Sequence, residues 1–597
     1  MATNPVEQYN ENITALTEKL NLLYKKRKRI ALYRLLTVLL TCVLAYFLFP
    51  VSIVAGWAII FVGLIIFLFL LSADANNKLE IGNQETLLLI NKNEIDYIKG
   101  SFYHQYGGES SEPEDHAYSI DMDVFGKASL FQYINRATSS QGQQLLANNL
   151  LRAIPKEELN ARVSAIKELA HLQLWRHQFQ AFGKMSSINL KTEQRLSKWV
   201  LLPPTLKNKW WRGVVHLFTI ISVSLALLCI FSYIGASLYG SLFLLMTAIS
   251  FYLGKNATPV HNQLSNIADQ IDTVYKQVNH FEKEQFQSEF LKEIQQNIKI
   301  DKRSASEEIK ELKSILARFD YRLNLIVAVL LNTFLLWDVR QILALDQWKK
   351  KNNELLPGCF KAIATMEVLN SLSTLFYNHP GWCFPEWSDE HFTFSGEAIG
   401  HPLLLKEKRV DNSFSMSGTG KVALITGSNM SGKSTFLRSL GANLVLAHMG
   451  APVCALAFTT SYIRLMSSMR ITDNLAENTS TFYAELKKLE TIIKSVNNKE
   501  PVFILLDEIL RGTNSMDRHT GSAAMIRQLI RQKAVAVIAS HDLELASLEM
   551  DFPDALSNYH FDVQVENEEL FFDYKLKSGV CRSMNATLLM KKIGIEL

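Results

Sequence analysis

KVALITGSNMSGKST, residues 421–435, is the stretch that decides how the C-terminal part of this 597-residue chain folds. It opens with a short apolar run rich in β-branched residues, Val422–Thr426, which predicts a buried strand. Residues 427–434 then fit the phosphate-binding pattern G-x-x-x-x-G-K-[ST]. Glycines at these positions let successive backbone N–H groups point at phosphate oxygens, and a following helix N-terminus adds a favourable dipole. The stretch therefore predicts a nucleotide phosphate site, in which Lys433 reaches the β- and γ-phosphates and the Ser434 hydroxyl ligates Mg²⁺.

Two later apolar runs predict strands that end beside this loop. Residues 502–506 (VFILL) lead into Asp507 and Glu508, and residues 534–539 lead into Ser540 and His541. An acid at a strand tip suits a Mg²⁺ contact for Asp507, and the next carboxylate, Glu508, suits polarising the attacking water. His541 is predicted to sense the γ-phosphate, with a purely structural histidine as the alternative. ATP binding and hydrolysis with Mg²⁺ is the predicted activity.

The N-terminal region predicts a membrane hairpin. Residues 35–49 and 51–71 are nearly uninterrupted apolar runs separated by Pro50, and each can reach the length of a membrane-spanning helix. The basic cluster at residues 25–29 precedes them directly, which favours a cytoplasmic anchor over a solvated patch or a nucleic-acid contact. A cleaved signal peptide is rejected because a second span follows at once.

A second hairpin is predicted over residues 213–254, which contain no Lys, Arg, Asp or Glu. Its flanks carry basic residues and an aromatic pair typical of a membrane interface: Lys207, Lys209, Trp210, Trp211, Arg212 and Lys255. Four transmembrane helices follow from the two hairpins. All flanks lie on one side, which must be the cytoplasm because ATP is there, so the predicted location is the inner (cytoplasmic) membrane.

The remaining patterns concern the helices between and after the hairpins. Leu264, Ile267, Ile271, Val274 and Val278 form a heptad stripe that predicts packing along another helix. Residues 323–337 are apolar but short and contain two asparagines, which predicts a buried core helix. The six cysteines show no metal-ligand spacing and favour a reducing compartment, and the net charge of +4 says nothing by itself about nucleic acid.

The nucleotide motifs resemble those of the MutS family of DNA mismatch repair ATPases. The phosphate loop reads T-G-S-N-M-S-G-K-S-T over residues 426–435, and S-T-F over residues 480–482 is followed by Glu485. D-E-I-L-R-G-T over residues 507–513 is similar to the family's D-E-I-G-R-G-T, and A-S-H over residues 539–541 stands where the family has A-T-H. Residues 124–166 resemble more weakly the start of the MutS helical core.

The resemblance implies a composite site that works only in a dimer, here a homodimer. Ser480 would reach the γ-phosphate bound by the partner subunit, with simple capping of the following helix as the alternative. Glu508, His541 and Lys433 are the implied catalytic residues, and Ser434 and Asp507 the implied metal ligands. The residues expected to hold ATP are Gly427, Ser428, Asn429, Met430, Ser431, Gly432, Lys433, Ser434, Thr435 and Ser480.

The predicted fold is multi-domain, α and α/β, with two transmembrane helical hairpins, a helical MutS-like core with lever helices, and a C-terminal P-loop (ABC-type) ATPase with a parallel sheet. The predicted divisions are an N-terminal helix (1–30), hairpin 1 (31–72), a linker (73–116), the core (117–355) interrupted by hairpin 2 (213–254), and the ATPase domain (356–597).

The chain also departs from the family in ways that leave two functions open. The first hairpin stands where a mismatch-reading domain would be, and the second where DNA-gripping clamps would extend from the levers. The first hypothesis is a membrane-tethered MutS-like ATPase that binds DNA, including mismatched DNA. The second is a membrane ATPase that uses nucleotide-driven closure for conformational or signalling work and has lost DNA binding. The basic residues outside the ATPase domain mostly flank the predicted membrane spans, where topology explains them, so no identifiable DNA surface supports the first.

Overall fold

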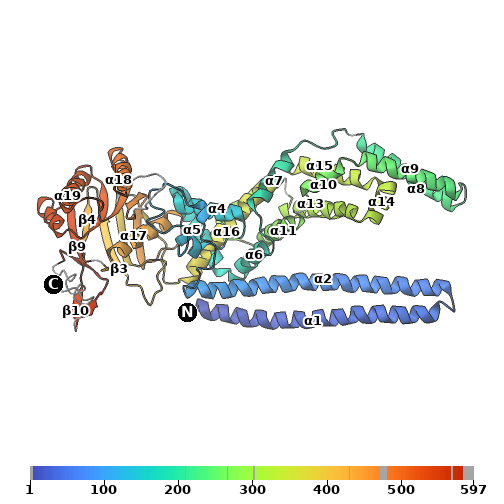
Figure 1. Ribbon diagram of the computed structural model, residues 1–597, viewed down its shortest axis with the longest axis horizontal. Coiled ribbons are helices and arrows are strands. Elements are labelled where there is room, and N and C mark those ends of the chain that lie inside the picture. Colours follow the sequence, from blue (N-terminus) through green and yellow to red (C-terminus); the bar gives the residue numbers. More distant parts are fainter. Residues whose placement is uncertain are drawn as a thin grey trace.

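The computed structural model describes residues 4–208, 210–264, 267–299, 303–428, 430–470, 481–566 and 569–581. The molecule is elongated, with the strands gathered at one end and short helices in the middle (Figure 1). Two separate groups of helices extend to the opposite end. The helix-rich α/β class predicted from the sequence is confirmed, and the sheets are mixed.

The N-terminal hairpin consists of two very long helices, α1 (Pro5–Leu48) and α2 (Ile53–Ile98), joined by a turn at the predicted Pro50. Each helix is continuous, so there is no break near residue 30 or residue 72. The linker predicted over residues 73–116 is wrong as far as Ile98, because this segment is the second half of α2.

The polar half of α2 is helical because it packs against the polar half of α1. Asp74 accepts from Arg34 at 3.0 Å, and the Asn77 side chain donates to the Leu23 carbonyl at 3.1 Å. Mixed composition is what an interface between two solvated helices requires, and it is easily mistaken for a linker. The remainder of the predicted linker contains one short 3₁₀ helix, η1 (Glu109–Ser111).

The middle of the molecule is the predicted helical core. Its helices are α3 (Leu130–Ile134), α4 (Ser140–Leu151), α5 (Lys156–His171), α6 (Gln173–Met185), α7 (Leu190–Leu201), α10 (Ala257–Leu264), α11 (Ala268–Lys283), α12 (Glu289–Asn297), α13 (Ala305–Phe319) with η2 (Asp320–Leu323), α15 (Trp337–Lys351) and α16 (Leu355–Asn378). All five residues of the heptad stripe are buried, and α11 packs along α13 and α6 as predicted.

Helix α16 lies across the predicted boundary between the helical core and the C-terminal domain at residue 356. It packs against α5 and α4 over most of its length and is buried on nearly all sides. The helical core therefore continues to Asn378, and the C-terminal domain does not begin at residue 356 as predicted.

The second hairpin is formed by α8 (Trp211–Ile230) and α9 (Ala236–Leu253), in agreement with the predicted range. Among the described residues, α1, α2, α8 and α9 are long and apolar enough to cross a membrane. A fifth candidate is the pair α14 (Leu325–Leu335) and α15, which is bent by 78°.

Helix α14 is not the buried core helix that its composition predicts. Leu325 and Ile326 are each 74% exposed, whereas Asn332 and Thr333 are buried against the second hairpin. The Thr333 hydroxyl lies 2.8 Å from that of Thr247, and Ser222 donates to the Phe334 carbonyl at 2.9 Å. The polar side of α14 faces protein and its apolar side faces outward, which is the reverse of a water-soluble core helix.

The C-terminal end contains two main sheets. A four-stranded sheet has the order β1 (Glu386–Ser388), β5 (Ala457–Ser461), β2 (Thr393–Ile399), β3 (Asn412–Ser417). A six-stranded sheet has the order β12 (Leu576–Ser578), β9 (Leu556–Phe561), β4 (Val422–Thr426), β8 (Val535–Ser540), β7 (Val502–Asp507), β6 (Arg464–Ser468). β10 (Gln564–Glu566) and β11 (Glu569–Phe571) form a separate hairpin.

The six-stranded sheet is parallel except for its edge strand β12. Helix α17 (Lys433–His448) packs on one face, and α18 (Thr481–Asn497) and α19 (Ser515–Arg531) pack on the other. Burial on both faces explains why the central strands are continuous apolar runs without alternation. After β8 the chain forms η4 (Leu543–Ser547) and α20 (Leu548–Asp551). The predicted parallel sheet is confirmed, and β4, β8 and β7 end at one edge.

Candidate nucleotide-binding site

The phosphate loop lies between β4 and α17, where the sequence predicts it. Gly427 has φ 152° and Gly432 has φ 102°, both in the region that favours glycine. A Cβ at Gly427 would lie 2.9 Å from the Phe561 carbonyl oxygen and 3.0 Å from the Ser431 hydroxyl. The two glycines therefore allow the tight loop that brings its backbone to the N-terminus of α17.

Lys433 is the first residue of α17 and crosses the mouth of this loop. Its ammonium donates to the carbonyl oxygens of Gly427 at 2.8 Å and Ser428 at 2.9 Å. The residue is only 5% exposed, and burial lowers the pKa of its ammonium to about 8. Lys433 is thus a buried cation that is held in place by uncharged carbonyl groups.

Strands β7 and β8 bring the acids and the histidine to the same edge. Glu508 Oε1 pairs with His541 Nε2, and Glu508 Oε2 lies 3.1 Å from Arg511 Nε. The hydrogen bond from His541 is the main reason that the pKa of Glu508 falls to about 2. The other ring nitrogen of His541 lies 2.9 Å from the Gly427 carbonyl oxygen, so the histidine links Glu508 to the phosphate loop.

Two residues of this network were given no role by sequence reasoning. Arg511 donates to the Asp507 carbonyl at 3.0 Å and also pairs with Glu508. Glu485, from α18, accepts the backbone N–H groups of Leu510 at 2.6 Å and Arg511 at 3.2 Å. Glu485 belongs to the motif S-T-F…E, and Arg511 belongs to D-E-I-L-R-G-T. The joint occurrence of these two motifs was the only sequence signal that could have pointed to a contact between them.

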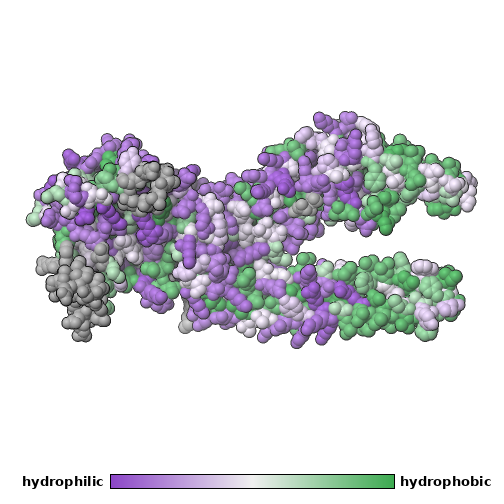
Figure 2. Space-filling model, in the orientation of Figure 1, coloured by the Kyte–Doolittle hydropathy of each residue, from purple (hydrophilic) through white to green (hydrophobic). Residues whose placement is uncertain are grey.

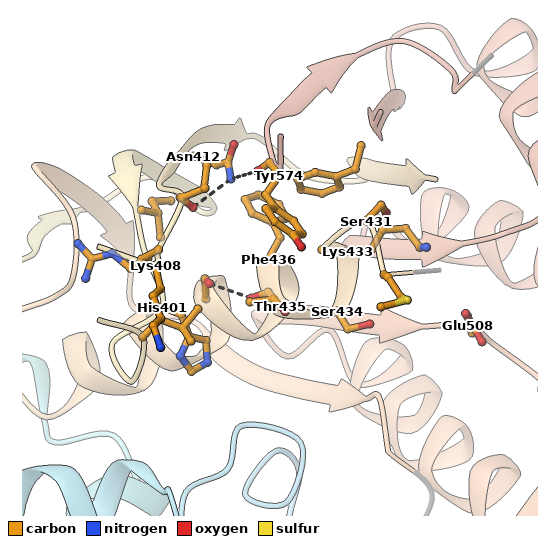
Figure 3. A pocket seen from close by; sticks show the side chains of 18 residues that line it. His401, Lys408, Asn412, Ser431, Lys433, Ser434, Thr435, Phe436, Glu508 and Tyr574 are labelled. Carbon is orange, nitrogen blue, oxygen red and sulfur yellow. Dashed lines mark hydrogen bonds between the residues drawn. The ribbon is translucent and has the colours of Figure 1, made fainter. Parts of the chain in front are cut away.

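A cavity of about 430 Å³ opens beside the loop (Figure 3). Its walls are formed by the loop and α17 on one side and by residues of β3, its preceding loop and the C-terminal segment on the other. The residues labelled in Figure 3 are His401, Lys408, Asn412, Ser431, Lys433, Ser434, Thr435, Phe436, Glu508 and Tyr574. The Asn412 side chain fixes this wall by donating to the Tyr574 carbonyl at 3.0 Å and accepting from the Leu576 N–H at 2.9 Å.

The residues present fit a magnesium nucleotide. The Ser431 hydroxyl is buried and has no hydrogen-bond partner within the described part of the chain, so an acceptor such as a phosphate oxygen would satisfy it. A hydroxyl (Ser434) and a carboxylate (Asp507) are oxygen ligands of the kind that Mg²⁺ prefers. The cavity volume lies in the range of small-molecule sites.

The structure brings together most of the predicted site. The side chains of Lys433, Glu508 and His541 meet, and Asp507 lies beside them on β7. Thr435 is exposed on the first turn of α17. Asn429 and Ser480 lie outside the described residues, so their predicted roles remain predictions.

A phosphate loop before α17, an acid pair after β7 and a histidine after β8, all at one edge of a parallel sheet, are typical of P-loop domains. Comparison with known families agrees with this class and narrows it. Residues 423–594 match the family model of MutS domain V. The matched part of this chain, residues 423–594, thus belongs to the MutS family.

Three relatives indicate how far the similarity extends. The DNA mismatch repair protein MutS of Thermotoga sp. (strain RQ2) is 31% identical over 251 residues, which are 41% of this chain and 31% of the relative. MutS protein homolog 4 of Homo sapiens is 33% identical over 221 residues, 35% of this chain and 23% of the relative. DNA mismatch repair protein MSH4 of Arabidopsis thaliana is 32% identical over 234 residues, which are 38% of this chain and 29% of the relative. The chain thus spans less than a third of each relative's length.

Proposed function

We propose that this chain is a membrane-anchored MutS-like ATPase, which binds and hydrolyses ATP with Mg²⁺ and uses the cycle to move membrane helices. The observation that carries the ATPase part is that Lys433 and Glu508 line one cavity and that His541 contacts both of them. Magnesium in this site would neutralise phosphate charge, with Ser434 and Asp507 as its protein ligands.

The roles of the chain's own groups follow from their positions. Lys433 and the loop N–H groups hold the phosphates, and the Ser431 hydroxyl donates to one of their oxygens. Glu508 stays ionised at neutral pH and can accept a proton from water once it is released from His541. Arg511 and His541 determine where its two oxygens point. Water activation therefore requires this ion-pair network to open.

Membrane anchoring is supported by the distribution of apolar surface. Figure 2 shows hydrophobic side chains covering the ends of both hairpins at the same end of the molecule, far from the nucleotide site. In α2, Phe61 is 64% exposed and Phe69 73% exposed; in α8, Ile220 is 63% exposed. Exposed apolar surface of this extent is typical of lipid-facing helices. We propose the inner membrane as the location, with the core and the nucleotide site in the cytoplasm.

We further propose that the active form is a homodimer, in which Ser480 of each subunit completes the site of the other. The support is the resemblance of the S-T-F motif and its position in the chain directly before α18. Glu485 of α18 already binds the backbone of the loop after Glu508. Movement at the start of α18 would therefore be transmitted to the catalytic carboxylate.

DNA binding is the second candidate, and it rests on the relatives, two of which are named DNA mismatch repair proteins. The membrane function is preferred because the positions expected for DNA clamps carry apolar helices instead. The basic cluster at residues 25–29 is explained by its place on α1 next to the apolar surface.

The substitution Glu508→Gln tests the ATPase. It keeps the shape of the side chain but removes the group that accepts a proton, so turnover should fall by about 10²-fold or more while ATP binding is retained. Glu544→Gln is the matched control, because Glu544 lies at the same sheet edge and is 84% exposed. Unchanged hydrolysis in the Glu508 variant, or equal loss in both variants, would overturn the assignment.

A further inference from the structure

A second cavity, of about 330 Å³, lies at the base of the second hairpin, far from the nucleotide site. It is enclosed by the first turns of α8, the end of α13 and one face of α15. The polar and aromatic residues that line it are Arg212, His216, Arg318, Trp337, Arg340, Gln341 and Gln347. No carboxylate lines it.

The three arginines of this cavity bind only uncharged groups. Arg340 donates to the Leu335 carbonyl at 2.7 Å and to the Thr219 hydroxyl at 3.0 Å. Arg212 donates to the Gln347 side chain at 3.1 Å, and Arg318 to the Ser314 carbonyl at 3.2 Å. Within the described part of the chain, their other guanidinium N–H groups have no hydrogen-bond acceptor.

None of the three makes an ion pair with any described residue. The nearby Asp338 lies 3.5 Å from Arg322, and Asp346 lies 3.3 Å from Lys349, so each of these acids has its own cation. Three positive charges thus surround a cavity without a protein counterion. Three guanidinium groups around one space are the usual means of binding a phosphate group.

The position of the cavity, next to the exposed apolar surface of α8, indicates where that phosphate would come from. His216 lines the cavity, and the next residue, Leu217, is 59% exposed at the start of the apolar surface of α8. Trp210 and Trp211 stack at the same level, as aromatic residues do at a membrane interface. Helix α14, with its exposed apolar side, leads into the cavity residue Trp337.

We propose that this cavity binds the phosphate of an anionic membrane phospholipid, with the acyl chains along the exposed apolar surface of α8 and α14. The inference rests on the proposed membrane anchoring and names a ligand for it. Basic residues next to a membrane helix are common as topology signals, which would account for Arg212. That explanation does not cover Arg318 and Arg340, which come from α13 and α15 and converge on the same space.

The test uses the full-length chain in an uncharged detergent. Binding of dihexanoyl phosphatidylglycerol, dihexanoyl phosphatidylcholine and inorganic phosphate is measured by calorimetry. The double variant Arg212→Gln/Arg318→Gln removes two exposed arginines of the cavity. Lys26→Gln/Lys28→Gln removes the same charge from the exposed basic cluster beside the first hairpin and is the matched control. Basal ATPase activity reports that each variant is folded.

The wild-type chain should bind the anionic lipid at least about tenfold more tightly than the zwitterionic one. The affinity of the arginine variant for the anionic lipid should be about thirtyfold lower than that of the wild-type chain. The affinity of the lysine variant should stay within about twofold of the wild-type value. Equal loss in both variants, no preference for the anionic lipid, or inorganic phosphate binding as tightly as the lipid would each overturn the proposal. Extraction of the wild-type chain from vesicles at pH 11 separates the two claims. A chain that is released contradicts membrane anchoring itself, whereas a chain that is retained without lipid preference contradicts only this inference.

Discussion

At the scale of single residues, the backbone at the sheet edge that carries Glu508 is held in a restrained conformation. Glu508 has φ 52° and Leu510 has φ 62°, which costs non-glycine residues about 1 kcal/mol or more each. The arrangement persists because the Glu508 N–H donates to the Ala539 carbonyl at 2.9 Å and Glu485 accepts the next N–H groups. The side chain that would activate water is therefore fixed by its backbone before any nucleotide chemistry begins.

Lys433 gives the nucleotide site a pH dependence of predictable sign. Burial lowers the pKa of its ammonium to about 8, and bound phosphate requires the charged form. Above pH 8 binding must therefore take up a proton, so affinity for Mg-ATP should fall by up to tenfold per pH unit, and it should be nearly constant from pH 6.5 to 7.5.

Titration with a fluorescent ATP analogue between pH 6.5 and 9.5 measures this dependence. Lys433→Arg is the control, because arginine keeps its charge over the whole range and should show weaker but pH-independent binding. A flat profile in the wild-type chain would show that Lys433 keeps its charge up to pH 9.5 and that burial does not depress its pKa.

At the scale of elements, the first hairpin is anchored to the core by a buried polar network. Glu94 of α2 forms a bidentate pair with Arg136 at 2.8 and 2.9 Å, and it also accepts from Asn378 at the end of α16. The Tyr9 hydroxyl of α1 donates to the same Asn378 at 2.7 Å. Both helices of the first hairpin thus meet at the junction between the helical core and the C-terminal domain.

Glu94→Gln should destabilise the protein by about 3–5 kcal/mol, because it leaves Arg136 buried without its counterion. Burial alone would raise the pKa of Glu94, but Arg136 outweighs this and the pKa is lowered. The contribution of the pair is therefore present above the ordinary glutamate pKa and is lost as the pH falls below it. Glu80→Gln breaks the exposed pair with Lys19 in the same hairpin and should cost less than about 1 kcal/mol.

Urea unfolding of the detergent-held chain at pH 7 compares the two variants. Similar midpoints for both would mean that the buried network does not anchor the hairpin.

Helix α14 should face lipid on its apolar side. A cysteine at Ile326, in a chain without the more accessible native cysteines Cys42, Cys229 and Cys383, should resist a water-soluble maleimide in sealed or open vesicles. The same reagent should quickly label a cysteine at Tyr103, an exposed residue in the segment that follows α2. Fast labelling at both positions would place α14 in water.

The elements differ in how well the sequence predicts them. The central strands and their tips follow directly from short apolar runs between turn signals, and the heptad stripe of α11 predicts its packing. Helix α14 is misjudged because an apolar composition does not say whether protein or lipid surrounds it; only the direction of Asn332 and Thr333 in space decides. The polar half of α2 is missed because the residues of α1 that it contacts lie 40 and 54 positions earlier in the chain.

At the scale of the whole molecule, the nucleotide site and the apolar hairpins occupy opposite ends (Figure 1). The core helices between them include α16, which follows α15 in the chain and runs through the helical core toward the strands. Closure at the nucleotide site would therefore act on the apolar hairpins through this core. The distribution of apolar surface, rather than any single motif, is what favours the proposed membrane function over DNA binding.

The most direct test is the steady-state ATPase activity of the chain in lipid nanodiscs, with and without duplex DNA, from 50 to 300 mM salt. We expect robust basal turnover that varies with lipid composition and does not change with DNA at any salt concentration. Stimulation by DNA that falls steeply with salt would reveal phosphate contacts. That result would contradict the proposed membrane function and favour DNA binding, the second candidate.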